Sequence, residues 1–132
     1  MHEMTLEKRI ELTRAIISLL DDWGLSAVQQ VEILGLPSGT RPGLIRQYRQ
    51  NTPFPIDEQV AERIEHIIGI AEALRTSHPL NSAMDAIWIN KANYRLDNRT
   101  PLSVMVEDGL RGIISVRAQL DCTFDWSRLA AP

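Results

Sequence analysis

The chain lacks several features that would point to secretion, to a membrane or to disulfide stabilisation. Cys122 is the single cysteine, so no disulfide can form within one chain, which is consistent with a reducing compartment. No apolar run approaches the roughly 18–20 residues that span a bilayer. Residues 1–4 include no basic segment and no apolar segment follows them, so no signal peptide is predicted. We therefore expect a cytoplasmic protein without membrane contact.

Residue patterns that carry catalysis or hold metals are also scarce. His2, His66 and His78 are scattered, and none forms a close pair with another histidine or with the cysteine at a spacing typical of metal ligands. No glycine-rich phosphate loop, nucleophile elbow or Cys–His arrangement is present. Proton transfer and nucleophilic attack both need a cluster of polar side chains. The sequence therefore predicts no cofactor, no metal and no enzymatic activity.

Hydrophobic periodicity is the strongest positive signal. Apolar residues recur at three- and four-residue steps through most of the 132 residues, which predicts an all-α protein of about seven helices. We expect a bundle resembling a helix-turn-helix over residues 1–56, a long connecting helix over residues 57–80 and a small helical domain over residues 81–132. The last of these is predicted to end in a helix that reaches about Leu120 and a tail beyond it.

Capping signals set the expected helix starts. Ser26 with Gln29 forms a capping box, in which each side chain binds a backbone N–H of the other residue, and Ser82 with Asp85 has the same spacing. Asp57 is expected to cap the long helix, because its carboxylate can accept hydrogen bonds from the N–H groups of the first helical turn. Thr followed by Pro at the first helical position is a strong start signal, seen at Thr100-Pro101. Thr40, with a proline two residues on, is predicted to cap the third helix.

The third helix is also a candidate DNA-reading element. Residues 37–56 contain three arginines and no acidic residue, a local excess of positive charge that suits an anion or a nucleic acid. Arginine can bind guanine and glutamine can bind adenine in the major groove. The alternative is a solvated arginine face on an ordinary core helix. The predicted DNA-binding residues are Arg41, Gly43, Arg46, Gln47, Arg49 and Gln50.

The last 45 residues or so carry a second candidate surface, because four aromatic residues are interleaved there with arginines. Aromatic and arginine side chains dominate the energetics of many protein interfaces. The alternative is that the aromatics fill a small core, which is the stronger reading for Trp88 because its short helix needs an anchor. The predicted partner-binding residues are Trp88, Asn93, Arg95, Arg99, Arg111, Trp126 and Arg128.

At these positions the chain resembles the Xre/MbcA/ParS antitoxins with their C-terminal toxin-binding domain. The resemblance covers most of the chain. It is carried by the order of one tryptophan, a short Asn-containing turn, a Thr-Pro-Leu helix start and a final helix with valine and leucine: Trp88, Ala92-Asn93, Pro101-Leu102, Gly109 or Gly112, Val116 and Leu120. The segment between Gly35 and Tyr48 is longer than is typical of that family.

The resemblance implies a homodimeric antitoxin that binds and blocks a RES-domain toxin, an enzyme that consumes NAD or transfers ADP-ribose. The C-terminal domain would cover the toxin's active site, and the helix-turn-helix half would bind operator DNA. The alternative is a helix-turn-helix transcriptional regulator without a toxin partner. A small enzyme is a third reading, which the absence of a polar cluster disfavours.

Overall fold

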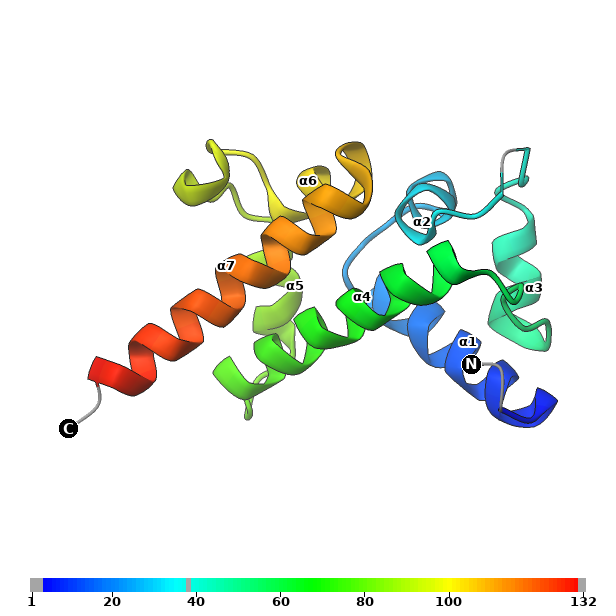
Figure 1. Cartoon of the computed structure of the whole chain (residues 1–132), viewed down its shortest axis with the longest axis horizontal. Helices are drawn as coiled ribbons and strands as arrows, with labels where there is room; N and C mark the ends of the chain where they lie inside the picture. Colours follow the sequence, from blue (N-terminus) through cyan, green and yellow to red (C-terminus); the bar gives the residue numbers. More distant parts are fainter. Residues whose placement is uncertain (1–3, 38, 131–132) are drawn as a thin grey trace. The chain divides into compact units, whose positions relative to one another are not determined.

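A computed structural model describes residues 4–37 and 39–130 of the chain, and the side chains of these residues as far as Asp121. The described part is all-α, as predicted, and contains one isolated β-bridge but no strand. The helices, with one short 3₁₀ turn η1, follow one another in this order (Figure 1): α1 (Leu6–Asp22), α2 (Ala27–Leu34), α3 (Leu44–Gln50), α4 (Glu58–Ser77), α5 (Ala83–Ile89), η1 (Tyr94–Leu96), α6 (Pro101–Glu107) and α7 (Gly109–Ala130).

The chain divides into two compact units, Met1–Glu65 and His66–Pro132, called unit 1 and unit 2 below. The division falls within α4, the helix that the sequence predicts as a connection. None of the helices in the described part is long and apolar enough to cross a membrane.

Unit 1 follows its capping signals closely at the first two helices. α1 ends at Asp22 with Trp23 as its C-cap, and Gly24 takes the left-handed conformation with φ of 90°, which a glycine adopts without steric cost. The predicted capping box then starts α2: the Ser26 hydroxyl accepts from the Gln29 N–H at 3.2 Å, and the Gln29 side chain accepts from the Ser26 N–H at 2.8 Å. The two signals together place a tight turn between α1 and α2.

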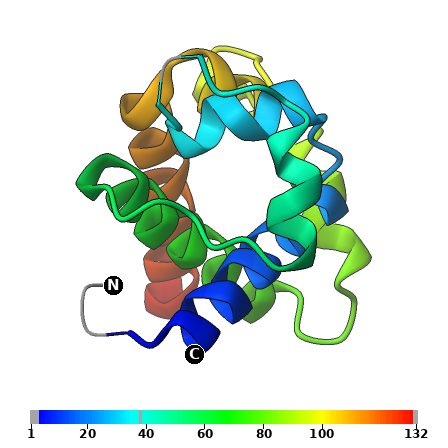
Figure 2. The same ribbon diagram turned by 90° about the vertical axis from the view of Figure 1, so that its right-hand side faces the viewer.

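The core of unit 1 forms where α1 packs against α3, and Figure 2 shows these helices from the side. The Tyr48 ring of α3 meets the Phe54 ring edge-on, with centroids 4.9 Å apart. Thr13 of α1 is buried yet satisfied, because its hydroxyl accepts from the Phe54 N–H at 3.0 Å and donates to the Arg9 carbonyl at 2.8 Å. These contacts fasten the proline-rich segment after α3 to α1.

Two predicted caps are wrong. The Thr40 hydroxyl donates to the Pro37 carbonyl at 2.6 Å, and α3 starts later, after Gly43, with no side-chain cap. Ser82 already has helical backbone angles and its side chain caps nothing, while the Asn81 side chain accepts from the Ala83 N–H at 3.2 Å. In both places a nearby backbone group or side chain competes with the predicted capping bond.

Unit 2 is built around the close pair α6 and α7. The Thr100 hydroxyl caps α6 as predicted, accepting from the Ser103 N–H at 3.1 Å. Gly109 turns the chain with φ of 66°, and Gly112 then lies so close to the Val104 carbonyl that a Cβ would not fit. The buried side chains that surround this pair come from α4 through α7, and they include Ile67, Ile70, Leu74, Ile89, Met105, Ile113 and Val116.

α4 and α7 also meet within unit 2. The Arg117 guanidinium of α7 lies over Gly69, where a side chain would obstruct it, and its Nη1 is 3.1 Å from Nδ1 of His66. His66 is thus half-buried and hydrogen-bonded to Arg117, although the charged residues near it in the sequence suggest a solvated side chain. α7 continues to Ala130 rather than ending near Leu120, because no helix-breaking glycine or proline occurs between these two positions.

Candidate functional site

The outward side of α3 gathers most of the residues predicted to bind DNA. Ile45 and Tyr48 are buried against the rest of unit 1, which leaves the opposite side of this short helix in solvent. Five of the six predicted residues are exposed, on α3 or in the turn just before it. Their own side chains form no hydrogen bond or ion pair with the residues that the structure describes, although the Gln50 backbone carbonyl accepts from the Arg14 side chain. We call them the α3 face: Arg41, Gly43, Arg46, Gln47 and Gln50.

Arg49 is exposed too but is engaged within unit 1. Its Nε and Nη2 donate to the two carboxylate oxygens of Asp21 at 2.9 and 3.0 Å. Gln30 donates to the same carboxylate at 2.7 Å. The bonds from Arg49 hold the pKa of Asp21 below its usual value, so the pair stays ionised. Arg49 is therefore partly neutralised, whereas Arg46 keeps its full charge for an anion.

The connection from α2 to α3 is long for a helix-turn-helix. It covers residues 35–43, whereas the usual connection has about three or four residues. Gly35 starts it in the left-handed conformation with φ of 63°, and the Arg63 side chain occupies the space that a Cβ would need. Position 35 therefore favours glycine for two independent reasons, the left-handed backbone and the nearby Arg63 side chain.

In unit 2, three of the predicted partner-binding residues help to shape the fold. Trp88 is half-buried, and the adjacent Ile89 is fully buried, so Ile89 is the main anchor of α5. The Asn93 side chain accepts from the Arg95 N–H at 2.9 Å and caps η1. Arg99 donates to Asp108 at 2.7 Å and to Glu107 at 2.8 Å.

The Arg99 cluster fastens the loop over residues 93–99 to the end of α6. The bonds from Arg99 lower the pKa of Asp108, and those carboxylates in turn raise the pKa of Arg99. A surface depression of about 550 Å³ opens beside this cluster. Its lining includes Arg95, Asp97 and Gln119 as well as Arg99 and Asp108, and in the cluster beside it one arginine pairs with two carboxylates.

Two further predicted residues, Arg95 and Arg111, are exposed. The Arg95 guanidinium lies 5.6 Å from the centre of the Tyr94 ring, and its Nε donates to the Tyr94 hydroxyl at 3.0 Å. Trp126 and Arg128 belong to the helical backbone of α7, but their side chains lie outside the described residues. They stay predictions.

The sequence reasoning missed an apolar surface on α5. Leu80, Met84 and Ile87 are all exposed, and we call these three residues the α5 face. Met84 and Ile87 are three residues apart, the spacing that marks one side of a helix, and Leu80 lies in the turn before α5. In the sequence, however, such a stripe is typical of a buried face, and α5 has a second apolar side at Ile89 that is the buried one.

Among the described residues, no group of three or more His, Cys, Asp or Glu side chains comes together in a way that would hold a metal ion.

Comparison with known proteins identifies one relative. No family model matches the chain, and no solved structure matches it. The uncharacterized protein y4oB of Sinorhizobium fredii is 31% identical over 107 residues, which cover 81% of this chain and 79% of that protein. The chain belongs to the y4oB family.

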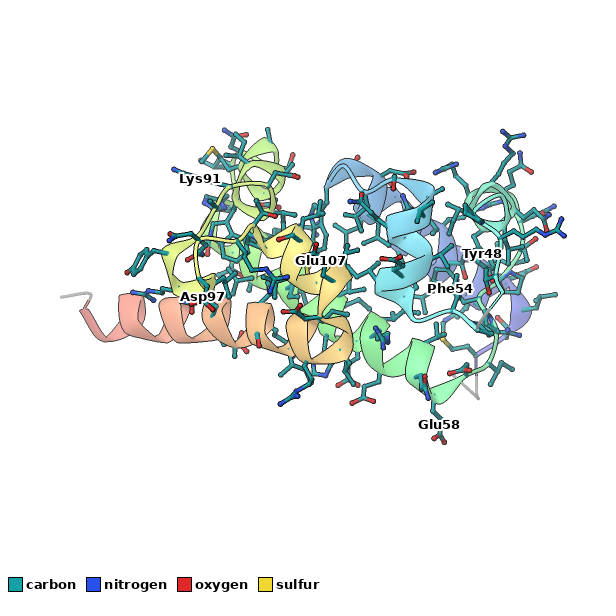
Figure 3. The ribbon with its side chains drawn as sticks, turned by 90° about the horizontal axis from the view of Figure 1, so that it is seen from above. Tyr48, Phe54, Glu58, Lys91, Asp97 and Glu107 are labelled. Carbon is teal, nitrogen blue, oxygen red and sulfur yellow. The ribbon has the colours of Figure 1, made fainter. Side chains whose placement is uncertain are left out.

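In this member of the y4oB family, the two exposed faces thus differ in chemistry. The α3 face of unit 1 is polar and basic. The α5 face of unit 2 is apolar, and Lys91 follows it on the outer side of that unit, away from α7 (Figure 3). Basic faces suit anions, and apolar faces suit other proteins.

Proposed function

We propose that this chain is the antitoxin of a type II toxin–antitoxin system, that it binds and blocks a RES-domain toxin, and that it represses its own operon by binding DNA. The proposal assigns no catalysis to this chain. It rests on the resemblance of the segment from Trp88 to Leu120 to the toxin-binding domain of Xre/MbcA/ParS antitoxins, and the RES-domain partner comes from that resemblance alone.

The exposed apolar surface of unit 2 is the structural observation that favours a protein partner. Unit 2 already has a core of its own, so the α5 face is not needed to fold it. Apolar side chains grouped in solvent are typical of surfaces that another protein covers. A protein that blocks an enzyme needs such a surface, because most of the affinity of an interface comes from a few well-buried residues.

Co-expression tests this function. The reading frame beside the gene is expressed alone and together with this chain, and both growth and co-purification are measured. We expect the neighbour alone to arrest growth, and the pair to grow normally and to purify as one complex. A neighbour that is harmless alone and forms no complex contradicts the proposal.

A transcriptional regulator without a toxin partner is the second candidate, and the α3 face favours it. Arg46 is exposed on this face and forms no ion pair with the described residues. An arginine in the major groove donates two bonds to guanine, so its removal weakens specific binding by about 1–3 kcal/mol. Under this candidate the chain binds its promoter and the neighbouring product neither arrests growth nor binds.

The DNA-binding part of both candidates is tested by Arg46→Ala. We expect a gel shift on a duplex from the upstream region to weaken at least about fivefold, the lower end of the range of about 1–3 kcal/mol. Arg75→Ala is the matched control, since Arg75 is also exposed and has no side-chain partner among the described residues but lies on unit 2. If Arg46→Ala binds the duplex as the unaltered chain does, the recognition role of α3 is wrong.

A further inference from the structure

Exposed apolar side chains are concentrated in one short part of unit 2. Of the eight large hydrophobic residues that are exposed in the described part of the chain, four lie between residues 80 and 94. They are the α5 face and Tyr94, and Leu80 and Tyr94 are 99% and 75% exposed. Single exposed apolar residues are normal on a protein surface, but a group is not.

The geometry of α5 explains why this group is presented together. Met84 and Ile87 are three residues apart and share one side of the helix, while Leu80 lies in the turn that precedes α5. Ile89, on the other side, is fully buried and fixes the orientation of the helix. The outward apolar side chains are thus held in place by a buried residue of the same helix.

The charges beside the α5 face have one sign. Lys91 and Arg95 are exposed, while the only acid between residues 80 and 96, Asp85, is half-buried. One Asp85 carboxylate oxygen lies 3.4 Å from Nδ1 of His78, and the Asp85 side chain is only 18% exposed. The first exposed acid beyond this segment is Asp97. Within residues 80–96 the exposed side chains are therefore apolar, polar or positively charged, while Arg95 also faces the depression that the acids Asp97 and Asp108 line.

Arg95 is already oriented for such a role. The contact of its guanidinium with the Tyr94 ring, described above, restricts both side chains before any partner arrives. A side chain that is restricted in the free protein loses less conformational entropy on binding. Tyrosine and arginine are also the residue types enriched at the energetic centres of interfaces.

We propose that the α5 face, with Lys91, Tyr94 and Arg95, is the surface through which unit 2 docks on its protein partner, and that the partner presents an apolar hollow bordered by carboxylates. This inference rests on the proposed antitoxin function, because it names the surface and the chemistry of that partner. The apolar groups would supply affinity, and the two cations would speed association and select an acidic partner.

The test uses the full chain and the purified product of the adjacent reading frame. Met84→Gln combined with Ile87→Gln keeps helix-favouring residues and removes the apolar surface. We expect the dissociation constant to rise at least tenfold. The matched control is Leu6→Gln with Val28→Gln, which removes two exposed apolar side chains from unit 1 and should leave the dissociation constant unchanged.

A second variant tests the charges and does not depend on the apolar residues. Lys91→Glu with Arg95→Glu should slow association severalfold in low salt, and the difference should shrink as the salt concentration rises. Circular dichroism checks that each variant keeps its helix content. If Met84→Gln with Ile87→Gln unfolds the chain, the variant Lys91→Glu with Arg95→Glu, whose side chains are exposed, tests the inference instead.

The outcomes separate the inference from the function on which it rests. If the unaltered chain binds the neighbour and both variants bind it equally well, the inference fails and the antitoxin function stands. If the unaltered chain binds no neighbour, both fail. A homodimer that Met84→Gln with Ile87→Gln dissociates, or α5-dependent binding to anionic lipid vesicles, would assign the surface to a second copy or to a membrane and overturn the inference.

Discussion

The α3 face and the α5 face belong to helices of the same length, seven residues each, yet they present opposite chemistry. Each helix is held by buried side chains on its inner side, Ile45 and Tyr48 in α3 and Ile89 in α5. The outer side of α3 carries arginine and glutamine, and the outer side of α5 carries methionine and isoleucine, with the exposed Leu80 in the turn before it. The buried residues that anchor a short helix and the residues that it exposes to solvent can therefore vary independently.

The difference also separates two modes of binding. A basic face attracts phosphate over a distance of about 8 Å at physiological salt, and its binding weakens as salt rises. An apolar face gains free energy by removing area from water, which depends much less on salt. If both faces act as proposed, the two activities of this chain should respond differently to ionic strength.

The largest expected effect is the loss of unfolding free energy when the buried anchor of α3 is removed and that of α5 is kept. Tyr48→Ala removes a buried ring from the contact between α3 and Phe54, so unfolding free energy should fall by about 3–5 kcal/mol. Tyr94→Ala is the matched control, because the Tyr94 ring is mostly exposed and its loss should cost less than about 0.5 kcal/mol. Urea unfolding followed by circular dichroism measures both. Equal losses would show that α3 is not anchored by Tyr48.

A smaller effect compares one sequence signal in the two units. Thr100→Ala removes the cap of α6 and should cost about 1 kcal/mol of stability. Thr40→Ala removes only a bond between a hydroxyl and the Pro37 carbonyl in an exposed turn, so it should cost less. Thermal unfolding of both variants gives the ranking, and the reverse order contradicts the assignment of the two threonines.

The smallest expected effect on stability comes from removing the Asp21–Arg49 ion pair beside the α3 face. Asp21→Asn removes the carboxylate that holds Arg49, and because the pair is exposed the loss should stay below about 1 kcal/mol. The same change releases Arg49, so affinity for promoter DNA should rise. Asp22→Asn is the control, since Asp22 is exposed and forms no ion pair with the described residues. An unchanged or lower DNA affinity for Asp21→Asn contradicts the view that Asp21 restrains Arg49.

The contribution of Asp21 should also depend on pH in a defined direction. Because the pKa of Asp21 in the folded chain is lowered from about 3.8, its stabilising effect is present above that value and is lost as pH falls through the lower folded pKa. The stability difference between the unaltered chain and Asp21→Asn should therefore be constant from pH 7 to about pH 5 and should vanish in stronger acid. Urea unfolding at several pH values measures it.

Much of the fold was predictable because helix starts and stops are local signals. The capping box at Ser26 and the caps at Asp57 and Thr100 are each confirmed. These residues bind backbone groups two or three positions away, so the sequence alone contains both partners. The wrong caps at Thr40 and Ser82 fail for the same reason, since other local partners compete there.

The candidate surfaces were less predictable. The sequence marks Arg46 and Arg49 alike, and only the fold brings Asp21, 28 residues away, to Arg49. The sequence also offers Arg99 as a contact residue, whereas the fold ties it to acids eight and nine residues away. Charge pairs between distant residues leave no periodic trace in a sequence, so their effect on a surface appears only in three dimensions.

By itself the sequence determined that the chain is all-α and where most helices begin, because hydrophobic periodicity and caps act over a few residues. Only the tertiary structure decided which side of α5 is buried. A helix of two turns with apolar residues on both sides has no preferred inner face until neighbouring helices pack against one of them. In the folded chain the neighbouring helices bury Ile89, whereas Leu80, Met84 and Ile87 stay exposed to solvent.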